Sequence, residues 1–405
     1  MRGLSRVASG ALVVLVMAGC GTQTATPNLG VPTPSTSSRT PSGQTVPPGV
    51  TAEPGSASAP SAIPIGKFAT TGSMTTARRS DTDTRLSDGR VLLVGGQDAN
   101  GATLASAEIY DPKTGAFTAT GTMKVSRWGQ TATLLTDGRV LVVGGENEDT
   151  IPLDSAELFN PSTGKFSDAG KMSVGRVNQT ATLLKNGKVL LAGGADQSGS
   201  GIDSAELFDP ATNAFTAAGK MTVARWGQAA TLLQDGHVLI TGGQDTPEVF
   251  DTAELFDPAS STFSATGSMS TKRWGQTATL LVSGLVLVAG GQDADNTPLQ
   301  SAELFDPAKG SFTATAGSMT SIRVGHTANL LPNGLVLIAG GVDGDGNGIA
   351  SSELFDPSSG SFTATGSLHD KRGNHTATPL SNGQVLIAGG SDQDLVYDSA
   401  ELYQS

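Results

Sequence analysis

An arginine recurs at one fixed position through most of the chain, and the residues after it could bind a ligand. Three arginines are followed directly by tryptophan, at Trp128, Trp226 and Trp274, the only tryptophans of the protein. Two others have a histidine three residues later, at His326 and His375. Guanidinium groups bind carboxylates and indole faces stack on sugars or cations, so a cationic, aromatic-lined mouth is one interpretation. The seven arginines are Arg78, Arg127, Arg176, Arg225, Arg273, Arg323 and Arg372.

The second interpretation of the arginines is structural, because a glutamate also recurs once per repeat. A buried carboxylate needs a partner, and a repeat protein uses the same pair to build each unit. We therefore favour ion pairs for most of the ring, while the tryptophans remain open between ligand binding and packing. Glycan binding by all three tryptophans would require them to be exposed. The glutamates are Glu108, Glu157, Glu206, Glu254, Glu303, Glu353 and Glu401.

The first repeat departs from the others at its first strand. It reads Ser-Asp-Thr-Asp-Thr-Arg-Leu over residues 80–86, where other repeats read Thr-Ala-Thr-Leu-Leu. Asp81, Asp83 and Arg85 alternate onto one side of this strand, and charges at normally apolar positions are expected at functional sites. A divergent terminal repeat in which Asp83 pairs with Arg85 is the alternative. Catalysis would require these aspartates to converge with His326 or His375.

Acidic residues also follow the glycine pair of each repeat. One such loop, Asp343-Gly-Asp345-Gly-Asn347-Gly, matches the first half of a calcium-binding loop. The expected glutamate at the twelfth position is Leu354, and Glu353 comes one residue early. Weak calcium binding through Asp343, Asp345 and Asn347 and a solvated loop are both compatible with this pattern, and we favour the solvated loop.

These residues belong to a repeat of about 49 residues, which must position them. In each repeat the second predicted strand ends in a glycine pair. The first glycines are spaced by 49, 49, 49, 48, 50 and 49 residues, which indicates seven structural units. The apolar runs 132–135 and 140–143 flank Asp137-Gly138, which predicts a two-residue hairpin with positive φ at both turn positions. The glycines are Gly95, Gly144, Gly193, Gly242, Gly290, Gly340 and Gly389.

Each repeat supplies four strand signals joined mostly by short turns, so consecutive strands should be antiparallel neighbours. Radial repetition of such units predicts an all-β fold, a seven-bladed β-propeller. The chain ends in a third strand at 399–405 and begins, after a linker, with a fourth strand at 67–71. The N-terminal strand should therefore complete the last blade and remove two open edges. The arginine junctions and the loops after the glycine pairs should share one face.

The combination of Arg-x-x-Gln/His, Gly-Gly and Ala-Glu-Leu-Phe-Asp-Pro resembles the bacterial kelch repeat, found in the propeller domain of galactose oxidase. The resemblance covers residues 66–405 and implies a propeller that hosts binding modules, scaffolds or enzymes. Some kelch domains hold acidic peptides through an arginine at this position. The oxidase chemistry needs copper and a cysteine-modified tyrosine. Tyr110, Tyr397 and Tyr403 fall at structural positions, and the histidines lack ligand spacing, so we expect no such site and no cofactor.

The first 63 residues differ from the repeats. Residues 1–19 are typical of a signal peptide, with Arg2 and Arg6 before twelve apolar residues, too few to span a bilayer. Met-Ala-Gly-Cys at 17–20 resembles the lipobox of bacterial lipoproteins, which would lipidate Cys20, the only cysteine. An ordinary cleaved signal is the alternative. Residues 20–63 form a linker rich in Pro, Ser, Thr and Gly, and the propeller should occupy residues 64–405.

The net charge of the repeats limits the classes of partner that the protein is expected to bind. When Arg2, Arg6, Arg39 and Glu53 are removed from totals of 25 basic and 37 acidic residues, 22 and 36 remain, a net charge of −14. This charge argues against binding nucleic acid. We expect a monomeric, extracytoplasmic propeller, attached to the bacterial cell membrane or outer membrane through Cys20, that acts as a non-catalytic binding or scaffold module for a protein or a glycan at one face. A carbohydrate-active enzyme, oxidase-like or a hydrolase or lyase, with its site at the propeller mouth is the alternative.

Overall fold

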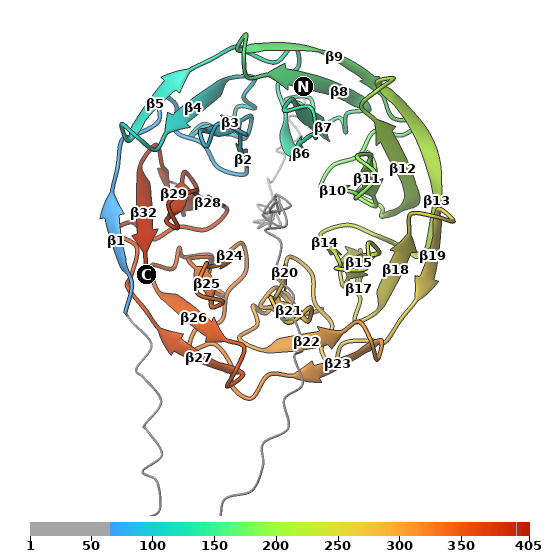
Figure 1. Ribbon diagram of the computed structural model, residues 1–405, viewed down its shortest axis with the longest axis vertical. Coiled ribbons are helices and arrows are strands. Elements are labelled where there is room, and N and C mark those ends of the chain that lie inside the picture. The colour runs from blue at the N-terminus through green and yellow to red at the C-terminus, as the bar shows by residue number, and fades with distance from the viewer. Residues whose placement is uncertain (1–64, 394) are drawn as a thin grey trace, which may run out of the picture. The chain divides into compact units, whose positions relative to one another are not determined.

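The computed structural model describes residues 65–393 and 395–405, and these residues form seven four-stranded antiparallel sheets, or blades, around one axis (Figure 1). In blades 1 to 6 the strands follow chain order from the axis outward. Blade 1 contains β2 (Thr82–Arg85), β3 (Val91–Val94), β4 (Ala107–Asp111) and β5 (Ala116–Ala119); blade 2 contains β6 (Trp128–Leu134), β7 (Val140–Glu146), β8 (Ser155–Asn160) and β9 (Lys165–Lys171); blade 3 contains β10 (Thr180–Leu183), β11 (Val189–Ala192), β12 (Ile202–Asp209) and β13 (Ala214–Arg225).

The next three blades repeat the same order. Blade 4 has a short hairpin in the loop between its second and third long strands, formed by β16 (Gln244–Asp245) and β17 (Glu248–Val249). The long strands of blade 4 are β14 (Ala229–Leu232), β15 (Val238–Thr241), β18 (Ala253–Asp257) and β19 (Thr262–Ala265); blade 5 contains β20 (Thr277–Leu280), β21 (Val286–Ala289), β22 (Ala302–Asp306) and β23 (Ser311–Ala314); blade 6 contains β24 (Thr327–Leu330), β25 (Val336–Ala339), β26 (Ser352–Asp356) and β27 (Ser361–Ala364).

Blade 7 joins the two ends of the described chain. Its sheet contains β28 (Thr376–Pro379), β29 (Val385–Ala388), β32 (Ala400–Gln404) and β1 (Lys67–Thr70), with Lys67 opposite Gln404. A short hairpin of β30 (Ser391–Asp392) and β31 (Leu395–Val396) precedes β32. The innermost strands of neighbouring blades contact one another around the ring, including β2 with β28. The predicted seven-bladed propeller and its closure by the N-terminal strand are confirmed.

Apolar residues of adjacent blades pack face to face, so the core lies between blades. The four residues of β3, Val91–Val94, are fully buried because both faces of this strand are covered. Phe159 of blade 2 packs in one cluster with Leu92 and Val94 of blade 1. In every blade an aromatic side chain of the third strand packs on one of the fourth, with ring centroids 4.8–5.0 Å apart. No helix of the described chain is long and apolar enough to span a bilayer.

The turn between the first and second strands differs from its prediction. The Gly138 amide donates to the carbonyl of Leu135, and Leu135 donates to the carbonyl of Arg139, so the loop has three residues. Only its glycine has positive φ, 85°, which corrects the predicted two-residue turn. Asp137 is favoured for another reason, because its carboxylate accepts the amide of Arg139 at 3.0 Å and closes the turn.

Candidate functional site

The seven repeated arginines are buried ion-pair partners inside the blades. Each is 0% exposed and binds the glutamate of the third strand of its own blade, at nitrogen–oxygen distances of 2.8–3.2 Å. Arg127 also donates to the carbonyls of Gly144 and Ser155. The structural interpretation therefore describes the geometry of the whole ring, because every guanidinium group of the ring is enclosed by protein.

The glutamate of each pair also holds the chain segment that enters the blade. Glu157 accepts the backbone amides of Lys124 at 2.8 Å and Val125 at 3.3 Å, in addition to the Arg127 fork. Burial lowers the pKa of Arg127, and Glu157 opposes that shift. The pair thus fixes the crossover between blades, a function that every repeat requires.

The position three residues after each arginine links neighbouring blades. The amide of Gln130 donates to the carbonyl of Val94 in blade 1 at 2.8 Å. Gln179, Gln228 and Gln276 each make the equivalent bond to a carbonyl of the preceding blade. His326 and His375 replace this glutamine and are 2% and 4% exposed. Burial lowers the pKa of each to about 3, so both imidazoles are neutral at pH 7.

Two of the three tryptophans are part of the core. Trp226 and Trp274 are 9% and 4% exposed and pack edge to face, with ring centroids 5.4 Å apart. They form a buried apolar cluster with Val177, Val324 and neighbouring loop residues. Exposure of all three tryptophans, which glycan binding by the set would require, is not observed. Trp128 is only partly buried and pairs with Glu146 on the same face.

A groove opens beside Trp128 on the face that carries the loops after the glycine pairs. We call it the Trp128 groove. Its apolar floor contains the buried Val177 and Trp226, and Glu146 and Asp196 contribute carboxylates. Burial raises the pKa of Glu146 above its ordinary value. The groove is lined by Trp128, Glu146, Thr150, Pro152, Val177, Asn178, Ala195, Asp196, Gln197, Gly199 and Trp226.

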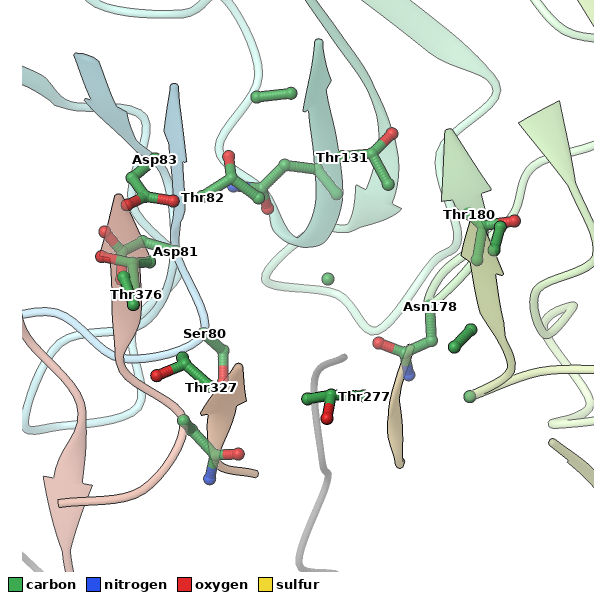
Figure 2. A pocket seen from close by; sticks show the side chains of 18 of the residues that line it. Ser80, Asp81, Thr82, Asp83, Thr131, Asn178, Thr180, Thr277, Thr327 and Thr376 are labelled. Atoms are coloured by element: carbon green, nitrogen blue, oxygen red, sulfur yellow. The ribbon is translucent and has the colours of Figure 1, made fainter. Parts of the chain in front are cut away.

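A second cavity follows the axis of the ring and brings together several of the predicted site residues. Asp81, Asp83 and His375 line it, together with small polar residues from all the inner strands. Figure 2 shows Asp81, Asp83 and Thr376 on one wall, where blade 1 meets blade 7. Asp83 accepts a hydrogen bond from Thr378 of blade 7, and Arg85 donates to the carbonyl of Pro379. His326 is not among the residues that line this cavity.

The two aspartates of this wall have raised pKa values. Burial raises the pKa of Asp81 to about 7; Arg78 lowers it and the neighbouring Asp83 raises it further. Burial raises the pKa of Asp83 to about 6, and its hydrogen bond with Thr378 opposes the shift. Asp81 is 5% exposed, and neither of its carboxylate oxygens has a hydrogen-bond partner within the described chain. The charged strand of blade 1 is therefore the most perturbed part of the axial wall.

The residue two positions after each arginine was missed by sequence analysis, although it lines the axis. All seven have positive φ of 52–69°, which explains glycine at four of them. Ser80, Asn178 and Asn374 take the same conformation, and their backbones bond to the neighbouring blade, as where Ser80 donates to the carbonyl of Asn374 at 3.0 Å. The recurrence of Gly, Asn or Ser two residues after each arginine was the signal that could have identified these positions.

The calcium-like loop is a structural turn. The carboxylate of Asp343 accepts the backbone amides of Asp345 and Asn347 and the Asn347 side chain, at 2.9–3.2 Å. The same turn is made by Asp98, which accepts two amides in the first blade. Both oxygens of the Asp343 carboxylate are thus occupied by N–H donors. Within the described ranges, no three or more His, Cys, Asp and Glu side chains gather as metal ligands.

The comparisons with known proteins agree with this fold. The model of the Kelch motif matches residues 78–124 and 127–173. The chain therefore carries Kelch motifs, and its fold is a seven-bladed propeller similar to that of galactose-oxidase-like enzymes. One similar solved structure is a fungal alcohol oxidase of the AA5 family in complex with copper, with 18% identity and a TM-score of 0.67 over 84% of this chain and 76% of that chain. No curated protein matches the sequence.

The residues of this chain do not fit the copper that the similar oxidase contains. Tyr110 and Tyr403 are fully buried between blades, where their hydroxyls contact Thr71 and Thr365. Tyr397 stacks on the guanidinium group of Arg372. Each buried histidine contacts a threonine hydroxyl through Nε2, 3.1–3.2 Å away. The predicted signal peptide, Cys20 and linker lie outside the described residues.

Proposed function

We propose that this protein is a lipid-anchored, extracytoplasmic Kelch propeller that binds a protein or a glycan without catalysis. The observation that carries the proposal is the Trp128 groove, where the repeat symmetry is interrupted by a partly exposed tryptophan between blades 2, 3 and 4. Uniform ion pairs and inter-blade bonds give the rest of the ring a structural role. An apolar floor with a few polar groups at its edge is typical of binding sites.

The chemistry of the groove favours a protein segment over a glycan. Glu146 and Asp196 place carboxylates beside an apolar floor, which suits a ligand that presents a basic and an apolar side chain together. A glycan platform would use several exposed indole faces, whereas two of the three tryptophans are buried. The net charge of −12 for the whole chain also favours a basic partner. The membrane attachment through Cys20 would place the propeller outside the cytoplasm.

A carbohydrate-active enzyme is the second candidate function. It is favoured by one observation, the pair of axial aspartates whose pKa values are raised to about 7 and about 6. Such values would suit a general acid and base at neutral pH. The buried imidazole of His375 shares the cavity, but it is neutral at pH 7 and its Nε2 contacts the Thr327 hydroxyl, so it adds no cationic proton donor beside the aspartates. We rank binding above catalysis for this reason.

The test compares ligand capture by the purified full chain and by two variants. The chain is applied to arrays of basic peptides and of oligosaccharides, and affinities are measured for the best binders. Trp128→Ala should weaken peptide binding at least tenfold. Ile322→Ala removes an exposed apolar side chain beside blade 6 and should change affinity less than twofold. Equal binding by Trp128→Ala and the unaltered chain would contradict the proposal, and product formation from an oligosaccharide would favour the enzyme.

A further inference from the structure

The junction between blade 7 and blade 1 lacks a contact that four other junctions have. Between blades 3 and 4, the carbonyl of Ala192 accepts the Thr180 hydroxyl at 3.4 Å and the Gln228 amide at 2.9 Å. The corresponding carbonyl of blade 7, that of Ala388, accepts the Thr376 hydroxyl at 3.4 Å. The residue at the glutamine position is Asp81, which is shorter and, when ionised, has no proton to donate.

The shorter side chain does not reach the glycine of the neighbouring blade. A methyl group placed on Gly193 would lie 2.4 Å from the amide nitrogen of Gln228, so the glutamine fills the space at the glycine. A methyl group on Gly389 would instead meet the Arg78 carbonyl at 2.5 Å and the Met74 side chain at 3.4 Å, with no Asp81 atom among its three nearest neighbours. We call the part of the axial cavity wall formed by Asp81, Asp83 and Thr376 the junction notch.

The charges around the junction notch are unbalanced. The guanidinium group of Arg78, the cation that acts on Asp81, already binds Glu108 at 3.0 Å. Asp81 is 95% buried from solvent, lines the axial cavity and has no hydrogen-bond partner for either oxygen in the part of the chain that the structure describes. Its electrostatic neighbours are Arg78, Asp83 and Glu108 from its own blade, while blade 7 presents neutral threonines. A buried carboxylate in this position must bind a proton or a cation.

We propose that Asp81 and Asp83 hold a hard metal cation of the calcium type in the junction notch. The side chains that form the notch offer oxygen donors: two carboxylates and a threonine hydroxyl. Calcium prefers oxygen donors, and water from the axial cavity completes the coordination. The cation lies against Asp81 and Asp83 of blade 1, beside Thr376 of blade 7. It therefore links the first and last blades, where the ring closes.

This site differs from the calcium-like sequence of blade 6. The Asp343 carboxylate already accepts several N–H donors, whereas the Asp81 carboxylate accepts none within the described residues. The two positions therefore provide a matched pair for an experiment. Changing Asp81 to glutamine introduces the residue that four other blades have at this position, so the variant is expected to fold.

The experiment is calorimetric titration of calcium into the full chain after metal removal with a chelator, at pH 8. We expect one site, with affinity at least tenfold lower in Asp81→Gln and in Asp81→Asn, which keeps the size of the side chain. Asp343→Asn should bind as the unaltered chain does. Absence of calcium binding, unchanged binding in both Asp81 variants, or loss of binding in Asp343→Asn would overturn the proposal.

Discussion

Removing one carboxylate of the repeated ion pairs should destabilise the propeller strongly. In Glu157→Ala, Arg127 would stay 0% exposed without its anion, and the amides of Lys124 and Val125 would lose their acceptor. Breaking a buried pair by removing one partner costs about 3–5 kcal/mol. The entropy of unfolding is about 2.1 cal/mol/K per residue, and the propeller has roughly 340 residues. A loss of about 4 kcal/mol, the middle of this range, therefore corresponds to a fall in Tm of about 6 °C.

The assay is urea unfolding followed by circular dichroism, with two comparisons. Asp154→Ala removes an exposed pair with Lys171 in the same blade and should cost less than about 1 kcal/mol. The double variant Arg127→Met, Glu157→Leu replaces both charges by apolar groups and should recover more than half of the loss. If Glu157→Ala costs no more than Asp154→Ala, the pair does not hold the blade and the reasoning is refuted.

Three further predictions concern the axis, the groove and the glycine pair. Because the pKa of Asp81 is raised to about 7, its ionisation should remove stability from the metal-free protein as pH rises from about 4 towards 7. This loss should be smaller in Asp81→Gln, which retains Asp83, when urea midpoints are compared. Trp128→Ala should lower affinity for the array-selected ligand while changing the unfolding free energy by less than about 1 kcal/mol. Gly193→Ala should destabilise the fold by several kcal/mol in the same unfolding assay, since the new methyl would lie 2.4 Å from the Gln228 amide and 2.6 Å from the Arg225 carbonyl at a φ of +66°.

The fold could be predicted almost completely from the sequence because repetition removes most ambiguity. Seven glycine pairs at nearly equal spacing determine the number of blades, and the strand left over at each end determines the closure. Matching numbers of arginines and glutamates also identified the ion pair, since a buried charge needs the same partner in every blade. The hairpin was wrong because Asp-Gly serves two turn types, and only the hydrogen bonds of Leu135 distinguish them.

The candidate sites were less predictable, because the exposure and contacts of their side chains depend on residues of the neighbouring blade. The sequence marked Asp81 as unusual, but it could not show that this side chain lies at the junction with blade 7, whose inner strands come from the other end of the chain. Trp128 and Trp226 have the same sequence context, yet one is partly exposed and the other buried. This difference arises from the neighbouring blade, where Trp226 meets Trp274.

The most direct test of the proposed binding function is hydrogen–deuterium exchange of the full chain with and without its best array-selected ligand. Binding in the Trp128 groove predicts slower exchange in the loops around residues 146–152 and 195–199, which line it. The turns around residues 87–90 and 136–139, at the other ends of the strands, should be unchanged. Protection confined to those turns, or spread evenly over all seven blades, would contradict the account.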